Sequence, residues 1–278
     1  MKKTLERIAY GLSTVLGLGR YGFFIPYRYA GSTVADEQHY AWILADFSRR
    51  GEESFVKILE DIKSFEDDIA PLAGPPPVPR WDQDWFPGLD AAAAYALVRT
   101  KRPGRILEIG SGHSTRFMMR AIQDAGLATK MTCVDPEPRA DISALDVELL
   151  RKPAQHVPID LLPRLESGDF LFVDSSHIAM PGGDIDWIVN VLLPGLPTGV
   201  FVHFHDVFLP DAYPESWSWR NYNEQIVVAA LMAGNRFQPV FSTHFIRNHR
   251  PDLVESRGLG WISLVPGAIE SSLWLETR

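Results

Sequence analysis

Two short polar clusters in the second half of the chain combine carboxylates with imidazoles, the groups that carry acid–base and metal chemistry. Asp174 and His177 begin and end the sequence DSSH, while His205 and Asp206 close the sequence HFHD, which begins at His203. Carboxylates and imidazoles that share one site shift each other's pKa, as acid–base sites require. Because an imidazole titrates near neutrality, the pattern predicts His177, paired with Asp174, as the catalytic base.

The same residues form a candidate metal site. Asp174, His205 and Asp206 offer two carboxylates and an imidazole to magnesium or another divalent cation, which would lower the pKa of a bound hydroxyl. Two histidines and a carboxylate would also suit a non-haem iron hydroxylase, the alternative activity. Along an extended strand His203 and His205 face one side and Asp206 the other, so the three are not expected simply to converge. His203, inside an apolar run, is expected to be a hydrogen-bonded core residue.

A glycine-rich turn, EIGSGHST (108–115), follows an apolar run and precedes a helical pattern. Glycines let the backbone turn tightly and let a ligand approach it closely. The turn lacks the third glycine of the dinucleotide fingerprint, and Glu108 favours a ligand with a cationic end. Asp135, after the next apolar run, is placed to accept hydrogen bonds from both hydroxyls of a ribose. The pattern fits a nucleoside with an amino-acid tail, S-adenosylmethionine; the alternative is a glycine turn with a structural role alone.

The elements that must position these residues alternate between short apolar runs and helical patterns. Strands are expected at 105–109, 130–134, 147–151, 169–173 and 199–204, and helices at 88–100, 114–125, 159–165, 184–193 and 222–233. This alternation predicts an α/β fold with a Rossmann-like, doubly wound, mostly parallel seven-stranded sheet. Strands at 237–242 and 260–264 would add an antiparallel edge. In such sheets ligands bind beyond the carboxyl ends of the strands, where both clusters and the turn lie.

Four segments together resemble a class I S-adenosylmethionine-dependent methyltransferase: LEIGSGHST (107–115), the acid Asp135, FLFVDSSH (170–177) and VHFHDVFLP (202–210). The resemblance covers about residues 80–265. It is strongest to the bacterial branch with a D-x-S-H motif, in which sugar and polyketide O-methyltransferases occur. It implies methylation of a small hydroxylated acceptor on oxygen.

The resemblance also implies the contacts to the cofactor. Glu108 would support the methionine end of S-adenosylmethionine, Asp135 would hold the ribose and Gln155 would face the adenine. The other cofactor-binding residues would lie in the glycine turn and at the end of the fourth strand: Gly110, Ser111, Gly112 and Asp174. Related sugar methyltransferases place two adjacent carboxylates where this chain has His205 and Asp206, which leaves the metal, or its presence, open.

The composition excludes several other classes of protein. The 278 residues carry 27 basic and 35 acidic side chains, a net charge of −8, and no long basic run, which argues against a general nucleic-acid binder. Cys133 is the only cysteine, so no disulfide forms within the chain, as is typical of a cytoplasmic protein. The proportions of hydrophobic and charged residues, 46% and 22%, are those of a globular protein.

The first 70 residues are expected to form a helical extension, which a proline-rich linker at 71–80 joins to a methyltransferase domain at 81–278. Apolar residues at 5, 8, 9, 12, 15 and 16 form one helical stripe, and residues 21–29 are mostly aromatic. Residues 1–30 carry five basic side chains and one acid, a net charge of +4, so the remainder of the chain carries −12. This stretch is interpreted as a peripheral membrane contact or as a surface that packs on the body or on a second copy in a homo-oligomer. A non-catalytic, membrane-associated relative is therefore a further alternative.

Two aromatic segments, 80–90 and 207–225, flank the predicted site. One interpretation is a lid over the acceptor, because aromatic walls suit a sugar or a phenolic ring. The other is that these side chains fasten the N-terminal region to the core of the protein.

Overall fold

The structure, a computed structural model, describes residues 2–33 and 40–278. The chain divides into two compact units, Met1–Asp36 and Glu37–Arg278. The first contains helix α1 (Lys2–Val15), as its apolar stripe predicts, and a 3₁₀ turn (Ala30–Ser32). Among the helices of the described residues, none combines the length and the apolar character that crossing a bilayer requires.

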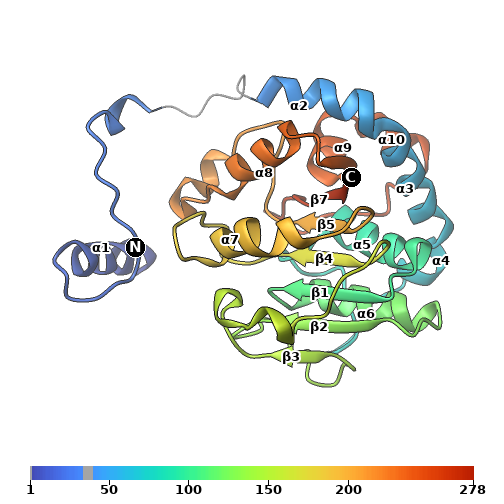
Figure 1. The fold of residues 1–278 in the computed structure, drawn as a ribbon. Coiled ribbons are helices and arrows are strands. Elements are labelled where there is room, and N and C mark those ends of the chain that lie inside the picture. The colour runs from blue at the N-terminus through green and yellow to red at the C-terminus, as the bar shows by residue number, and fades with distance from the viewer. Residues whose placement is uncertain (1, 34–39) are drawn as a thin grey trace. The chain divides into compact units, whose positions relative to one another are not determined.

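The centre of the second unit is a seven-stranded sheet in the order β3-β2-β1-β4-β5-β7-β6 (Figure 1). Its strands are β1 (Arg105–Ile109), β2 (Lys130–Val134), β3 (Glu148–Leu150), β4 (Phe170–Val173), β5 (Phe201–Phe204), β6 (Phe237–Ser242) and β7 (Leu273–Thr277). Strands β1 to β5 run parallel, and β7 pairs antiparallel with both β5 and β6. The predicted Rossmann-like, mostly parallel sheet is confirmed, with the antiparallel strand one position inside the edge.

The register of the parallel strands brings their carboxyl ends level with one another. Ile109 of β1 pairs with Val134 of β2 and with Val173 of β4, and Val173 in turn pairs with Phe204 of β5. The residues that follow these strands therefore lie along one edge of the sheet. They include the glycine turn and both polar clusters, so the sheet brings together segments that are almost 100 residues apart in sequence.

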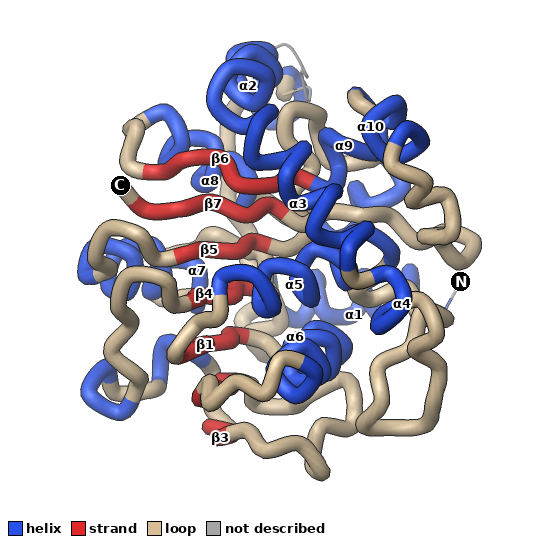
Figure 2. The backbone as a smooth tube through the Cα atoms, turned by 90° about the vertical axis from the view of Figure 1, so that its right-hand side faces the viewer, coloured by secondary structure: helices blue, strands red, loops and turns tan. Residues whose placement is uncertain are grey.

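Helices α3 (Glu52–Ser64), α5 (Gly88–Lys101) and α6 (His113–Asp124) pack side by side on the sheet (Figure 2). Helix α5 lies between the other two and is buried along most of its length, which accounts for its four consecutive alanines at 91–94. The other helices of this unit are α2 (Ala41–Asp46), α4 (Glu66–Ile69), α7 (Asp184–Trp187), α8 (Glu224–Ala233), α9 (Thr243–His249) and α10 (Pro251–Ser256).

Residues 40–70, which precede the proline-rich segment, belong to the second unit. Phe47 and Phe55 are fully buried, and their rings lie 5.3–5.8 Å from those of Phe241 and Phe245, near the other end of the chain. The proline-rich segment at 71–80 therefore runs within a packed unit, and the compact units divide between Asp36 and Glu37 instead of there. The prolines locally predict a linker between domains, but the burial of these aromatic rings makes residues on both sides of them part of one unit.

Two predicted elements do not form. Residues 260–264 make a turn and an irregular stretch, and the last strand of the sheet is β7, further along the chain. In place of the helix at 159–165 there is only a 3₁₀ turn (Ile159–Leu161), because Pro158 and Pro163 flank it and proline interrupts a helix. Short apolar runs do not distinguish a strand from a buried loop, which accounts for the first difference.

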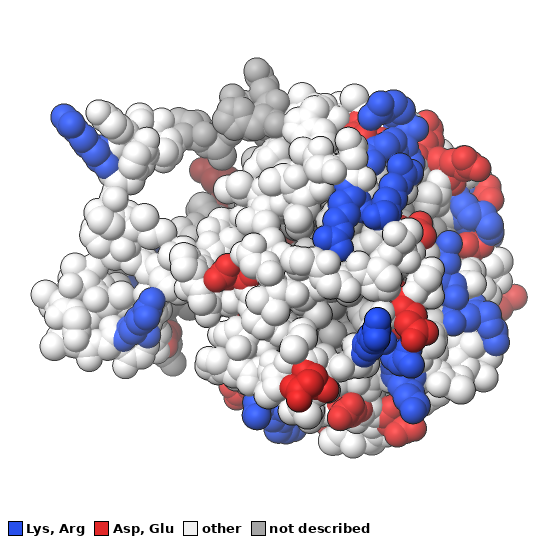
Figure 3. All heavy atoms as spheres, viewed as in Figure 1, with Lys and Arg blue, Asp and Glu red and all other residues white. Residues whose placement is uncertain are grey.

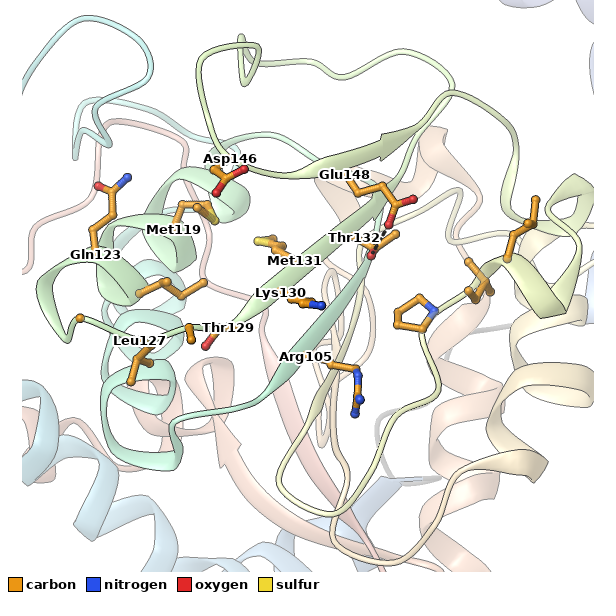
Figure 4. Close-up of a pocket in the computed structure, with 16 residues that line it drawn as sticks. Arg105, Met119, Gln123, Leu127, Thr129, Lys130, Met131, Thr132, Asp146 and Glu148 are labelled. Carbon is orange, nitrogen blue, oxygen red and sulfur yellow. Dashed lines mark hydrogen bonds between the residues drawn. The ribbon is translucent and has the colours of Figure 1, made fainter.

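A cavity of about 730 Å³ opens between α6 and strands β2 and β3 (Figure 4). Residues 135–147, which connect these two strands, form turns and no helix, so this connection leaves that face of the sheet open. Met119 of α6 and Met131 of β2 line the cavity, together with Arg105 and Lys130 at the amino ends of β1 and β2. The cavity is therefore distinct from the predicted site, which lies at the carboxyl ends.

Candidate active site

The glycine turn lies directly against the end of β4. Gly110 has a positive φ of 83°, a conformation that favours glycine, and its N–H donates to the carbonyl of Val134 at 2.9 Å. A Cβ at this position would overlap the backbone carbonyl of Asp174, whose own N–H donates to the carbonyl of Ile109 at 2.8 Å. Glycine is therefore required here for the close approach of the turn to Asp174.

Glu108 is sealed beneath the turn. Its two carboxylate oxygens accept hydrogen bonds from the hydroxyls of Ser114 and Thr115, both at 2.6 Å, and the thiol of Cys133 lies 3.3 Å away. The side chain is fully buried, and burial raises its pKa to about 7 although these hydrogen bonds oppose the change. Both oxygens therefore hold the first turn of α6, and the expected support of the methionine end of a cofactor stays a prediction.

Asp135 holds the same turn from the end of β2. Its carboxylate accepts hydrogen bonds from the backbone N–H of Ser111 at 2.7 Å, from the Ser111 hydroxyl at 3.0 Å and from the N–H of Glu137 at 2.8 Å. A carboxylate has about four acceptor positions, so one remains for a ligand hydroxyl. Glu108 and Asp135 therefore both bind the segment 111–115, at the glycine turn and the start of α6.

Three buried polar atoms along this edge have no hydrogen-bond partner among the described residues: Nδ1 of His113, Oε1 of Gln155 and Oγ of Ser175. They follow β1, β3 and β4, the strands that border the predicted cofactor site. Burial lowers the pKa of His113 to about 4, so its imidazole is neutral. A buried polar atom without a partner is costly, and a polar ligand such as a nucleoside would satisfy these atoms. The residues present therefore fit S-adenosylmethionine.

The two polar clusters converge. Nε2 of His177 lies 3.3 Å from the carboxylate of Asp174 and 3.4 Å from that of Asp206, while Nδ1 of His205 lies 3.6 Å from Asp174 and 3.4 Å from Asp206. Asp206 reaches His205 although strand alternation places the two side chains on opposite faces, because β5 ends at Phe204 and Asp206 adopts a positive φ of 55°. His177 also has a positive φ, 60°, a conformation that non-glycine residues adopt mostly where tertiary structure imposes it.

Two further carboxylates, Glu224 and Asp90, complete the cluster, and the sequence predicts neither one's contact with a histidine. Glu224, at the start of α8, accepts from Nδ1 of His177 at 2.9 Å and is almost fully buried. Asp90, in the first turn of α5, lies 3.2 Å from Nε2 of His205 and is fully buried. A carboxylate in the first turn of an otherwise apolar, alanine-rich helix was the available signal for Asp90. Nothing in the sequence indicates that Glu224 contacts His177, because its helix begins like many surface helices.

The charges in the cluster are strongly coupled. Burial alone would lower the pKa of His177 and His205, but the surrounding carboxylates, among them Asp174 and Asp206, outweigh it and place both well above the ordinary pKa of histidine. Burial would raise the pKa of Asp174, but the two imidazoles hold it well below the usual range. Asp174 is also the most accessible member of the cluster, with 30% of its side chain exposed, whereas His177 is buried behind it.

The predicted metal ligands Asp174, His205 and Asp206 come together, but their arrangement does not fit a cation. Both ring nitrogens of His205 face carboxylates as donors, towards Asp90 on one side and towards Asp174 and Asp206 on the other, whereas a metal requires a free lone pair on one of them. Within residues 2–33 and 40–278, no group of three or more His, Cys, Asp or Glu side chains is arranged to hold a metal ion. The iron hydroxylase alternative lacks its ligand set for the same reason.

His203 takes the structural role expected for it. It is fully buried, its Nε2 contacts the hydroxyl of Ser272 at 2.9 Å, and its ring stacks on Phe172 at 3.7 Å. Burial holds its pKa well below the ordinary value, so it is a neutral core residue.

The aromatic segments divide between the two interpretations. Trp81 and Phe86 pack inward: Trp81 lies against Phe117, and Phe86 against Phe172 and His205. Both side chains therefore anchor their segment to the core of the protein. The ring of Tyr222, in the other segment, lies 4.6 Å from the imidazole of His177 and borders the cluster.

A sheet of this order, with a glycine turn after β1, an acid after β2 and acid–base residues after β4 and β5, defines a nucleoside-binding enzyme of the Rossmann-like class. Residues 107–207 match the family described as a methyltransferase domain. The chain has the fold of a class I S-adenosylmethionine-dependent methyltransferase.

Several solved structures are similar to this chain, and no curated protein matches it. The methyltransferase PaMTH1 from Podospora anserina, solved with S-adenosylhomocysteine bound, is 16% identical with a TM-score of 0.45 over 92% of this chain and 99% of that chain. A putative O-methyltransferase from Klebsiella pneumoniae is 17% identical with a TM-score of 0.40 over 87% and 98%. A putative caffeoyl-CoA O-methyltransferase from Staphylococcus aureus is 12% identical with a TM-score of 0.42 over 87% and 99%. These likenesses are distant and carry none of the argument about the site.

Proposed function

We propose that this protein transfers a methyl group from S-adenosylmethionine to a hydroxyl oxygen of a small acceptor. The observation that supports this most strongly is the 3.3 Å contact between Asp174 and His177, at the strand end that touches the glycine turn. Methyl transfer to oxygen requires that the acceptor be aligned and its proton removed. A carboxylate and an imidazole beside the turn meet both requirements.

In this proposal Asp174, the accessible member of the cluster, accepts a hydrogen bond from the acceptor hydroxyl and aligns its oxygen. At a pH above its raised pKa, His177 is neutral and keeps its proton on Nδ1, where it donates to Glu224, while its Nε2 lone pair faces Asp174 and Asp206. A lone pair directed at carboxylates favours proton uptake, so the proton of the acceptor passes by way of the Asp174 carboxylate to Nε2. S-adenosylmethionine would supply a methyl group already activated by positive sulfur.

The residues that would hold the cofactor follow from their unused polar groups. Asp135 would accept from one ribose hydroxyl through its remaining acceptor position, and Gln155 would accept from the adenine amino group. Ser175, whose buried hydroxyl has no partner in the described part of the chain, would face the cofactor next to Asp174. Gly110, Ser111 and Gly112 would form the floor, with Glu108 acting through the loop that it holds.

The acceptor is proposed to be a sugar, a polyketide or another hydroxylated secondary metabolite that presents a ring. Tyr222 borders His177, and the guanidinium of Arg220 lies 4.0 Å from the ring of Trp217 in the same segment. Aromatic and cationic groups next to the base would bind a flat or cyclic acceptor through its face. A cytoplasmic location and a homo-oligomeric state stay predictions from the sequence.

We expect Asp135→Ala to weaken the binding of S-adenosylmethionine about tenfold or more, because it removes a charged hydrogen-bond acceptor from both the ribose and the turn. Isothermal titration of the purified chain with S-adenosylmethionine measures this. Asp160→Ala, at an exposed aspartate, is the matched control and should bind like the wild type. Absence of heat with the wild-type chain would contradict the proposed function.

We expect Glu224→Gln to lower the pKa of the His177 imidazole, because a carboxylate that stabilises the protonated ring is removed. Since His177 must be neutral to accept a proton, the acidic limb of the pH–rate profile should move to lower pH in the variant. Titration of the imidazole by NMR provides a reading without an acceptor. Glu215→Gln, at an exposed position of the neighbouring segment, should leave the titration unchanged, and an equal curve for both variants would contradict the role of Glu224.

A further inference from the structure

The first compact unit has an exposed apolar face. Side chains of the helical stripe are each more than half exposed: Leu5, Ile8, Leu12, Val15 and Leu16. None of the described side chains of residues 5–33 is buried. An apolar surface of this extent on a folded chain marks a place where something binds, since water does not stabilise it.

The segment that follows α1 extends this face with aromatic side chains. The backbone N–H of Tyr21 donates to the hydroxyl of Thr14 at 3.1 Å, and its ring stacks on Tyr10 at 4.7 Å, so the segment folds back onto the helix. Its large side chains are again each more than half exposed: Tyr21, Phe23, Phe24, Ile25, Tyr27 and Tyr29. Aromatic rings with polar edges concentrate at the boundary between lipid and water.

The charges of this unit suit an anionic surface. Residues 1–30 carry a net charge of +4, whereas the rest of the chain carries −12. The guanidinium of Arg20 lies 5.5 Å from the ring of Phe23, and that of Arg28 lies 5.5 Å from the ring of Tyr29, so cations and apolar rings alternate. In Figure 3 the surface of this unit is largely uncharged, with basic side chains at separate points.

We propose that residues 2–29 bind the surface of an anionic membrane, with α1 in the plane of the interface and its apolar stripe towards the acyl chains. An anionic lipid surface complements both properties of the unit, its apolar face and its positive charge. A second copy of the unit would cover the apolar face but would place like charges together. No described helix is able to span a bilayer, so the contact is peripheral.

Flotation of the full chain with vesicles tests this proposal. We expect binding to vesicles of phosphatidylcholine mixed with phosphatidylglycerol and weaker binding to phosphatidylcholine alone. Ile8→Gln should weaken binding about tenfold or more, because the lost isoleucine no longer enters the lipid. The matched control is Ile226→Gln, the same substitution on α8 of the second unit; Ile8 and Ile226 are 53% and 61% exposed. The control should float like the wild type.

A second variant separates charge from apolar contact. Replacing Lys2 and Lys3 by Gln should weaken binding to the anionic vesicles by about fivefold for each charge and leave binding to phosphatidylcholine alone unchanged. Equal flotation of Ile8→Gln and Ile226→Gln, or no flotation of the wild type, would overturn the proposal. A dimer that Ile8→Gln abolishes, without vesicle binding, would assign the face to a second copy and overturn it as well. Titration with S-adenosylmethionine should be the same for all variants, so this result is independent of the proposed reaction.

Discussion

Replacement of His177 by Gln is expected to lower the turnover number for methyl transfer about a hundredfold or more, the usual contribution of a positioned base. S-adenosylmethionine should still bind, because His177 is buried behind Asp174 and does not border the glycine turn. A panel of phenols, sugars and polyketides, assayed by release of S-adenosylhomocysteine, would supply the acceptor for the measurement. Loss of turnover with binding retained is the signature of a missing base in a folded enzyme.

Two controls accompany this experiment. His156→Gln, at an exposed histidine, should retain full activity. The wild type assayed after treatment with a chelator should also stay active, because the His205 nitrogens face carboxylates and leave no lone pair for a cation. Activity that disappears on chelation and returns with magnesium would assign Asp174, His205 and Asp206 to a metal and contradict proton removal by the imidazole alone.

Replacement of Asp90 by Ala is expected to lower the free energy of unfolding by about 3–5 kcal/mol, the range for removing one partner of a buried charged pair. The Asp90 carboxylate accepts from the hydroxyl of Thr243 at 2.5 Å and from the backbone N–H groups of Ser271 and Ser272 at 3.0–3.2 Å, and it faces His205. The alanine variant leaves the N–H of Ser271 buried without an acceptor, and it removes one of two acceptors from the Thr243 hydroxyl and from the N–H of Ser272. Urea unfolding followed by tryptophan fluorescence measures the difference.

The variant Asp90→Asn removes the charge of this side chain but keeps its size and shape. The amide keeps one acceptor oxygen, so its loss of stability should be smaller than that of the alanine variant. Asp160→Ala, at an exposed site, should stay within about 0.5 kcal/mol of the wild type. If Asp90→Ala unfolds at the same urea concentration as Asp160→Ala, the cluster around Asp90 contributes nothing to stability.

The buried parallel strands could be located from the sequence because each is a short apolar run followed by a polar residue or by glycine. The run before Gly110 and the run before Asp174 are of this kind. Strand β7 could not be located, because its place between β5 and β6 is decided by pairing with residues about 40 and 70 positions away. The boundary between the compact units could not be predicted for a similar reason, because Phe55 packs against Phe241 and Phe245, which are far from it in the sequence.

The candidate site was predictable only up to the ends of the strands. Asp174 and His177 follow β4 directly, so the sheet brings them together as the sequence indicates. The position of Asp206 depends on a left-handed backbone conformation, which strand alternation does not anticipate. Glu224 reaches His177 from a helix 47 residues further along the chain, and only the packed structure shows this pairing.

The burial of Glu108 beneath the glycine turn affects the chemistry of Cys133, the single cysteine of the chain. Cys133 is buried in β2 beside the carboxylate of Glu108, and burial together with that acid raises the pKa of the thiol far above its ordinary value. A thiol held in this way does not react with alkylating agents or oxidants while the sheet is closed. The rate at which Cys133 is alkylated therefore measures how often the nucleotide-binding half of the sheet opens. A cofactor that stabilises the glycine turn should lower this rate.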